Sequence, residues 1–179
     1  MSIKFNLNSI SRDNSQTKYA EADTLVFLLC QECKDYLGNL NLPANISQAM
    51  NLYIEKYPEI FDVADEHCFT IVDAGRIVNL IIVGCGKGKE CKPNNFRKAA
   101  GASARALNTV EAKSACLLAP VISKATRAHY LNAIVEGLLL GAYSYDKYKS
   151  DAKEPKACEL TIVNGVDDSL KVIEEEKDI

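Results

Sequence analysis

The segments of this chain that resemble β-strands are short runs rich in apolar and β-branched residues. Residues 24–30 (TLVFLLC) are continuously apolar, which is typical of a strand covered on both faces of a sheet. Residues 3–7 alternate apolar and polar side chains, as a half-buried edge or hairpin strand does. The remaining strands are predicted over residues 69–73, 77–83, 114–119 and 160–163.

A tight turn separates two of these predicted strands. Ala74, Gly75 and Arg76 lie between residues 69–73 and 77–83, and Gly75 readily adopts the positive φ angle that a hairpin turn requires. The turn therefore predicts one antiparallel pair of strands within the sheet.

Two shorter helices are predicted between the strands. Residues 45–57 carry apolar side chains at helical spacing, with Asn45 as a possible cap at the start and Pro58 ending the helix. Residues 94–107 predict a helix with a narrow face of alanine and glycine. Loops are expected over residues 31–45, 84–93 and 150–158.

The longest helix is predicted over residues 124–149. Along it Ala133, Gly137 and Gly141 recur every four residues. Because glycine costs about 1 kcal/mol in a helix interior, this line of small residues is expected where a neighbouring backbone comes close. Strands alternating with helices, together with the hairpin, predict an α/β domain with a mixed sheet.

The composition of the 179 residues is that of a globular protein, with 47% hydrophobic and 25% charged residues, which excludes disorder throughout, collagen and coiled coil. Residues 167–179 hold six acids and two lysines, so a tail of charge −4 leaves a body near +1. Such a body offers no basic face for nucleic acid. No apolar run reaches the roughly 18 residues that a membrane helix needs.

The seven cysteines are an odd number and follow no secretory segment, so we expect reduced thiols in a cytosol. Cys30 and Cys33 have the spacing of a redox pair, and a thiol-dependent enzyme is one alternative, although Gln31 and Glu32 between them are not typical of redox motifs. No second pair at this spacing completes a zinc site.

A glycine-rich loop, residues 84–89 (Gly84-Cys-Gly-Lys-Gly-Lys89), follows a predicted strand and precedes a predicted helix, where phosphate-binding loops occur. It matches neither the dinucleotide fingerprint nor the P-loop, because its third glycine comes one residue early and no hydroxyl follows its lysine. We expect a plain connection here, with phosphate binding as the alternative.

The two histidines complete the candidate chemistry. His67 lies beside Asp62, Asp65, Glu66 and Cys68 and superficially suggests a metal cluster, but one histidine among loop acids seldom supplies converging ligands, so a solvated loop is expected. His129 is expected on the surface or in packing at the start of the long helix. The residues alone therefore predict no catalytic, cofactor-binding or metal-binding site.

Two segments resemble a known family. Residues 133–150 (AIVEGLLLGAYSYDKYKS) resemble the EGxxLxxYxFDxYK segment in the N-terminal domain of the dizinc leucyl aminopeptidases, with Ser144-Tyr145 departing from the usual basic residue and Phe. The glycine loop with Phe96-Arg97 and the following Ala-Ala-Gly101 is similar to that family's "GxGK…RxAAG" stretch, and residues 160–163 match as well.

The resemblance implies a three-layer α/β/α sandwich similar to a macro domain over residues 1–165, with residues 166–179 beginning the linker to a catalytic domain. That catalytic domain would hold two divalent metals, zinc or manganese, and its Asn-Thr-Asp-Ala-Glu-Gly-Arg motif does not occur in this chain. We therefore expect a non-catalytic domain that contributes to a cytoplasmic hexamer and to active-site access. The alternative is a stand-alone macro-like module that binds a nucleotide or ADP-ribose.

Overall fold

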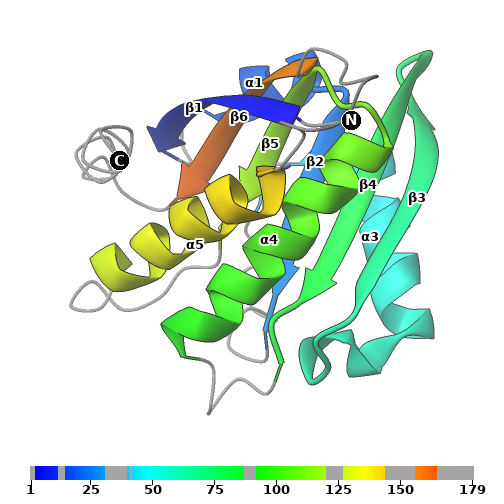
Figure 1. Cartoon of the computed structure of the whole chain (residues 1–179). Coiled ribbons are helices and arrows are strands. Elements are labelled where there is room, and N and C mark those ends of the chain that lie inside the picture. Colours follow the sequence, from blue (N-terminus) through cyan, green and yellow to red (C-terminus); the bar gives the residue numbers. More distant parts are fainter. Residues whose placement is uncertain are drawn as a thin grey trace.

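One mixed sheet organises the molecule, a computed structural model that describes residues 3–11, 15–30, 40, 42–86, 92–119, 127–143 and 156–164. Its six strands lie in the order β1-β6-β5-β2-β4-β3 (Figure 1). Neighbouring strands are parallel except β3, which is antiparallel to β4, so the predicted mixed sheet is confirmed. The strands are β1 (Ile3–Ser11), β2 (Thr24–Leu29), β3 (Glu66–Asp73), β4 (Arg76–Gly84), β5 (Ser114–Leu118) and β6 (Lys156–Asn164).

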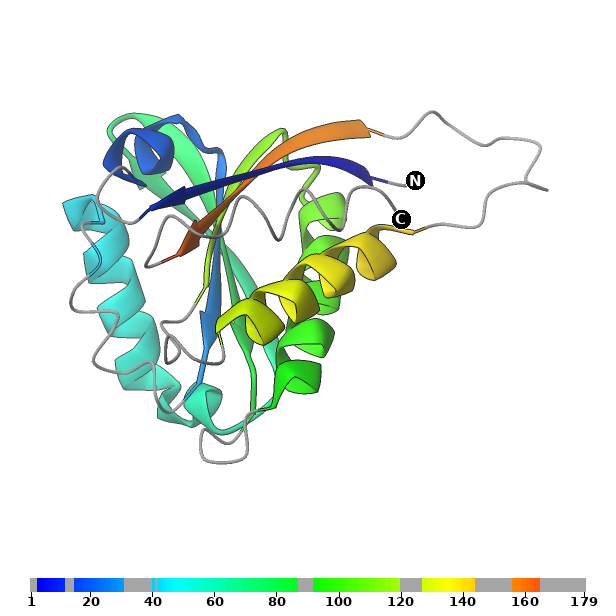
Figure 2. The same cartoon turned by 90° about the vertical axis from the view of Figure 1, so that its left-hand side faces the viewer.

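Helices cover both faces of this sheet. Figure 2 shows α1 and α3 on one side of the strands and α4 and α5 on the other, which gives the three layers of an α/β/α sandwich. None of the helices in the described part of the chain is long and apolar enough to cross a membrane. The helices are α1 (Ser15–Glu21), α3 (Ala44–Lys56), α4 (Pro93–Thr109), α5 (Arg127–Ala142) and the 3-10 helix η3 (Pro58–Phe61).

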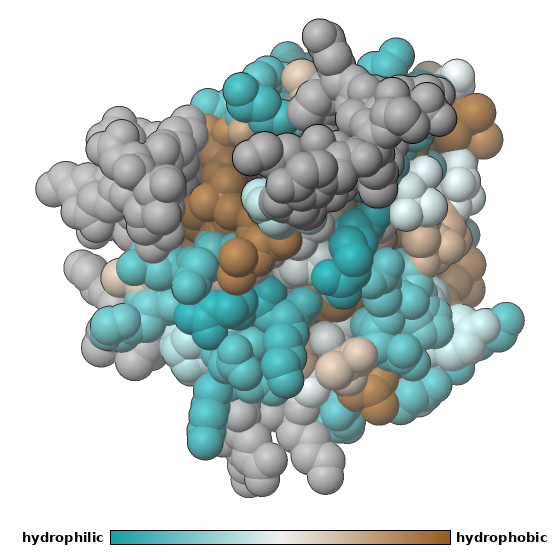
Figure 3. All heavy atoms as spheres, in the orientation of Figure 1, coloured by the Kyte–Doolittle hydropathy of each residue, from teal (hydrophilic) through white to brown (hydrophobic). Residues whose placement is uncertain are grey.

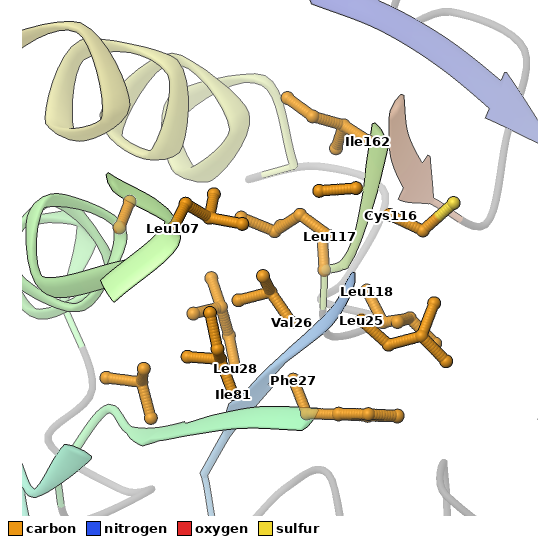
Figure 4. Close-up of a cluster of buried hydrophobic side chains, with 14 of the residues drawn as sticks. Leu25, Val26, Phe27, Leu28, Ile81, Leu107, Cys116, Leu117, Leu118 and Ile162 are labelled. Atoms are coloured by element: carbon orange, nitrogen blue, oxygen red, sulfur yellow. The ribbon is translucent and has the colours of Figure 1, made fainter. Parts of the chain in front are cut away.

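The central strand β2 supplies side chains to both faces. In Figure 4 Val26 and Leu28 point toward the side of α4 and α5, whereas Leu25 and Phe27 point to the opposite side. All four are fully buried, because alternate residues of a strand face opposite sides of its sheet. The prediction of a strand covered on both faces is confirmed.

The predicted hairpin joins β3 to β4. Asp73 pairs with Arg76, and both turn residues, Ala74 and Gly75, have positive φ angles of 47° and 79°. Arg76 extends from this turn to the carboxyl end of α1, where its guanidinium donates hydrogen bonds of 2.8 Å to the Tyr19 carbonyl and 2.6 Å to the Ala22 carbonyl. The hairpin thereby holds α1 in place.

The ends of several elements differ from the sequence predictions. Helix α3 begins at Ala44 after Pro43 and has no side-chain cap, so the Asn45 cap is wrong. Helix α5 ends at Ala142, whereas the prediction ran over residues 124–149; residues 124–126 and 144–149 lie outside the described residues. Helix α4 is slightly longer than predicted.

The strands are also longer than predicted where their side chains are polar. Strand β6 begins at Lys156, within the loop predicted at 150–158, because Lys156 and Glu159 point outward from a paired strand and give no apolar signal. Strand β3 begins at Glu66, so His67 belongs to a strand and the predicted solvated loop is wrong. Helix α1 was not predicted, because seven residues are too few for an amphipathic repeat.

Candidate functional site

The described half of the glycine loop is engaged in backbone hydrogen bonds. The N–H groups of Gly84, Cys85 and Gly86 donate to the carbonyls of Asp65, Leu29 and Val63, at 2.8, 2.7 and 3.2 Å respectively. A phosphate cradle needs free backbone N–H groups that converge on the anion. These three donors are already satisfied by the protein, and residues 87–89 of the loop lie outside the described residues.

The glycines of this half-loop have packing reasons of their own. A Cβ atom at Gly84 would collide with the backbone carbonyls of Val63 and Ile60, so the close approach of η3 to the end of β4 requires a glycine there. Gly86 has a φ of +84°, a conformation that favours glycine. This supports the expectation of a plain connection for the described part of the loop.

Asn95 ties the loop to the start of α4. Its side-chain oxygen accepts a 3.2 Å hydrogen bond from the Lys92 backbone N–H, and its amide nitrogen donates a 3.0 Å bond to the Cys85 carbonyl. Pro93, at the first helical position, has no N–H to offer a ligand. The side chain of Asn95 therefore fixes the start of α4 to the preceding loop.

An open cleft of about 710 Å³ lies along the outer surface of α4, next to this loop. Arg97, Lys98 and Arg105 place positive charge along it, and Asp65 and Glu66 place negative charge at its sheet side. Burial raises the pKa of the Glu66 carboxyl above its ordinary value, against an opposing effect of Arg105. Charges of both signs line the cleft, so its lining alone selects no single ligand charge.

The two segments that carry the family resemblance meet between α4 and α5, which lie side by side in Figure 1. The Arg97 guanidinium donates two hydrogen bonds, of 2.8 and 2.6 Å, to one carboxylate oxygen of Glu136. Both side chains are only partly exposed. Arg97 also donates to the Asn94 side chain at 3.1 Å, so its charge serves to join the two helices.

The predicted line of small residues forms the rest of this contact. A Cβ atom at Gly137 would collide with the Arg97 carbonyl, and one at Gly141 would lie 2.5 Å from the Gly101 carbonyl. The glycines therefore let the backbones of the two helices touch, as the sequence predicted for a neighbouring backbone. The sequence did not identify α4 as that neighbour, although an arginine and a glutamate in the two resembling segments were a signal that they contact one another.

Five cysteines lie within the described residues, and Cys68 is the exposed one among them. Cys30, Cys85, Cys116 and Cys158 are buried. Cys33 lies outside the described residues, so the candidate redox pair of Cys30 and Cys33 falls partly outside them. Burial raises the pKa of Cys116 and of Cys158 to about 12, which keeps both thiols protonated and unreactive at neutral pH.

The surroundings of both histidines are clear within the described part of the chain. Within the described ranges no group of three or more histidine, cysteine, aspartate or glutamate side chains is arranged to hold a metal ion. His67 instead packs against Tyr53 and Tyr57, with ring centroids 5.6 and 5.5 Å away. His129 is exposed in the first turn of α5, which corresponds to the first of its two expected places, the surface or a packing contact.

Comparison with known sequences identifies relatives for most of the chain. The profile of the cytosol aminopeptidase family's N-terminal domain matches residues 67–152. A probable cytosol aminopeptidase of Clostridium perfringens is 31% identical over 141 residues, which cover 78% of this chain and 27% of that protein. One of Streptomyces coelicolor is 43% identical over 82 residues, covering 42% of this chain and 15% of that protein.

Comparison with solved structures identifies the same fold. A mutant of tomato leucine aminopeptidase superposes with a TM-score of 0.67 at 14% identity, over 98% of this chain and 36% of that one. The bottromycin maturation enzyme BotP, in complex with Mn, gives a TM-score of 0.53 at 23% identity, over 86% of this chain and 28% of that one. The parts matched by this chain thus make up between 15% and 36% of the length of these proteins.

Proposed function

Because the chain carries the N-terminal domain of the cytosol aminopeptidase family, as its two resembling segments indicated, we propose that it is the non-catalytic part of a longer metalloaminopeptidase. Residues 1–165 form this domain and residues 166–179 begin the linker to the catalytic domain. The whole enzyme removes N-terminal amino acids from peptides by means of a metal-activated water.

The contact between Arg97 and Glu136 is the observation that carries this proposal. These two residues belong to the segments that resemble the family, and their charged groups are used to fasten α4 to α5. Side chains that lock one element to another are suited to a scaffold, whereas catalytic groups must face a substrate. The two divalent metals, zinc or manganese, are assigned to the catalytic domain, and the Mn in BotP supports manganese as one of them.

We assign this domain a role in the assembly of a cytoplasmic hexamer and in access to its active sites. An apolar surface at the carboxyl end of α5 supports such contacts, because Leu139, Leu140 and Tyr143 are 39%, 63% and 71% exposed. In Figure 3 hydrophobic atoms lie over part of α5 beside the hydrophilic surface of α4. Exposed large apolar side chains that gather in one place favour contact with another protein surface.

An activity assay and the gene sequence test the proposal that the chain is the non-catalytic part of a longer aminopeptidase. The purified chain is expected to hydrolyse no leucine p-nitroanilide in the presence of Zn²⁺ or Mn²⁺. The reading frame beyond the codon for Ile179 is expected to encode the Asn-Thr-Asp-Ala-Glu-Gly-Arg motif. Turnover that survives removal of contaminating peptidases, or a frame without this motif, contradicts the proposal.

The second function considered, binding of a nucleotide or ADP-ribose, is disfavoured by the glycine loop. Its described N–H groups already donate to the carbonyls of Asp65, Leu29 and Val63. We expect ADP-ribose to leave the melting temperature of the chain unchanged. A concentration-dependent rise in that temperature would favour the macro-like alternative instead.

A further inference from the structure

Aromatic rings line a second cleft, on the opposite side of the sheet from α4 and α5. The Tyr53 ring stacks on the Phe69 ring with centroids 5.4 Å apart and an angle of 18°. Tyr57 and His67 lie against the same Tyr53 ring, with centroids 5.1 and 5.6 Å away. The space beside them, here called the α3–β3 cleft, measures about 400 Å³ and is lined by Ala49, Leu52, Tyr53, Lys56, Tyr57, His67, Cys68 and Phe69.

Negative charge surrounds these rings. Residues 55–66 contain five acids and one lysine. The Asp65 carboxylate lies 3.8 Å from the His67 ring nitrogen. The pKa of Tyr53 is raised to about 12, mainly by burial, with the charges of Tyr57, Asp65 and Glu59 acting in the same direction. Asp65 therefore contacts the aromatic cluster through His67, and Glu59 belongs to the same acidic segment, so the surroundings of the cleft favour a positively charged group.

The cleft already holds one cation of the chain. The Lys56 ammonium lies over the Tyr57 ring, 5.2 Å from its centroid, which is a cation–π contact. Lys56 is otherwise an exposed residue on the last turn of α3. This contact shows that the outer face of the Tyr57 ring is accessible to an ammonium group.

The Tyr53 ring lines the cleft, but its hydroxyl oxygen is buried. The residue is only 8% exposed, and its hydroxyl has no hydrogen-bond partner among the described residues. A buried hydroxyl without a partner is unfavourable, and because this one is closed to solvent we assign it no contact with a ligand. Since no cluster of metal ligands occurs in the described residues, an organic cation fits the cleft better than a metal ion.

We propose that the α3–β3 cleft binds a basic peptide segment, with a lysine or arginine head group over the Tyr57 ring, near Glu59 and Asp65, in the place that Lys56 occupies here. The aromatic faces supply cation–π attraction and the two carboxylates supply long-range attraction. The proposal concerns this surface alone and does not depend on the role assigned to the domain as a whole.

Fluorescence anisotropy of a labelled peptide tests the proposal on the 179-residue chain. The probe is a short lysine–glycine repeat with blocked ends, and a glutamate–glycine repeat is its counterpart. Removing the ring by Tyr57→Leu is expected to weaken binding of the lysine peptide about threefold, the effect of one exposed cation–π contact. Glu59→Gln and Asp65→Asn are expected to weaken it as well, and added salt to weaken it further.

Lys56→Gln provides the sharpest measurement, because it removes the cation that competes for the ring. Binding of the lysine peptide is expected to become severalfold tighter in this variant. Glu21→Gln, which removes an exposed acid on α1, serves as the matched control and is expected to change nothing. All four cleft variants alter exposed or half-buried side chains, so folding is retained.

Three results overturn the proposal: no binding of the lysine peptide, equal binding of the glutamate peptide, or weaker binding in Lys56→Gln. Backbone amide shifts in NMR spectra locate the probe. Shifts confined to Tyr53, Tyr57 and His67 support the cleft, and shifts confined to the acidic residues 167–179 show that the tail attracts the peptide instead.

Discussion

The two faces of the sheet are covered in different ways. On one face α4 and α5 touch through their backbones, because Gly137 and Gly141 lie against the carbonyls of Arg97 and Gly101. On the other face α3 rests on the large rings of Tyr53 and Phe69, and α1 is held at its carboxyl end by Arg76. On the first face the two helices contact each other along their length. On the second face the contacts are made by aromatic rings and by hydrogen bonds at the end of a helix.

The first kind of contact fixes the positions of two helices, and the second leaves open space between side chains. A contact between backbones has no side chain that can move aside, so it fixes the angle and distance of two helices. Aromatic rings bury much area at a few points and leave openings between them, as in the α3–β3 cleft. The two helical segments that resemble the family lie on the rigid face, beside the open cleft of about 710 Å³, whereas the smaller cleft of the second face lies among aromatic rings.

The largest expected effect on stability comes from adding a methyl group where α4 and α5 touch. Gly137→Ala gains up to about 1 kcal/mol of helix propensity, but overpacking costs about 1–3 kcal/mol and here meets backbone. We expect a net loss of about 2 kcal/mol in the free energy of unfolding, measured by urea denaturation. Gly141→Ala is expected to behave similarly.

Two control variants keep this measurement interpretable. A Cβ atom at Gly101 has its nearest neighbour at 3.4 Å, so Gly101→Ala is expected to be neutral or slightly stabilising. Ala49 lines the open α3–β3 cleft, so Ala49→Leu is expected to change stability by less than about 0.5 kcal/mol. If Gly137→Ala stabilised the chain, the close contact between the helices would be absent in solution.

Removing the Arg76 side chain tests whether its hydrogen bonds to the carboxyl end of α1 stabilise the second face. Arg76→Met leaves the carbonyls of Tyr19 and Ala22 without their donor and is expected to cost about 1.5 kcal/mol. The same substitution should also make proteolytic cleavage within α1 faster. Arg105→Met, which removes an exposed arginine from α4, is expected to have little effect, and an equal loss in both variants contradicts the role of Arg76.

Alkaline pH is expected to act through the second face, toward which Cys116 points in Figure 4. In the unfolded chain this thiol loses its proton near pH 9, whereas burial raises its pKa in the folded chain to about 12. Stability is therefore unaffected below pH 9 and falls as the pH rises from 9 to 12. At pH 10 Cys116 contributes about 1 kcal/mol to this loss and Cys158, whose pKa is also raised to about 12, contributes a similar amount. Cys116→Ala should remove the first share only, and Cys68→Ala, at an exposed thiol, should leave the loss largely in place.

The smallest expected effect concerns the buried Tyr53 hydroxyl. Tyr53→Phe removes a polar group without a partner among the described residues and is expected to raise stability by less than about 1 kcal/mol. The same change should leave binding of the lysine peptide unchanged, because the buried hydroxyl is closed to the cleft and the ring is retained. Tyr57→Phe, at a half-buried ring, should leave stability unchanged, and a loss in Tyr53→Phe would reveal a structural partner for its hydroxyl.

The sequence predicts the interior of this fold better than its polar connections. Residues 24–30 and 77–83 are read correctly because their apolar side chains are buried by neighbouring strands and helices. The start of β6 and the whole of α1 are missed, because pairing and a distant arginine hold them, not a local apolar pattern. The line of Ala133, Gly137 and Gly141 is predicted because it has a regular spacing.

The candidate sites depend more strongly on contacts between distant residues. The glycine loop is recognisable in the sequence, but only the structure shows that its N–H groups meet the carbonyls of Asp65, Leu29 and Val63. His67 has acidic neighbours in sequence and aromatic neighbours in space, which come from α3. A short sequence window contains no signal for either arrangement.

The pairing of β1 with β6 has a consequence for synthesis on the ribosome. Ile3 pairs with Lys156, and β6 lies between β1 and β5, so the first strand made has no place in the sheet until the last one emerges. The nascent chain must keep the edge of β5 and the apolar residues of β1 exposed throughout that interval, a period when chaperones protect such surfaces. A circular permutant that begins with β6 and reaches β1 through a crossover linker, which two parallel strands require, would place the two partners together at the start and is expected to fold faster.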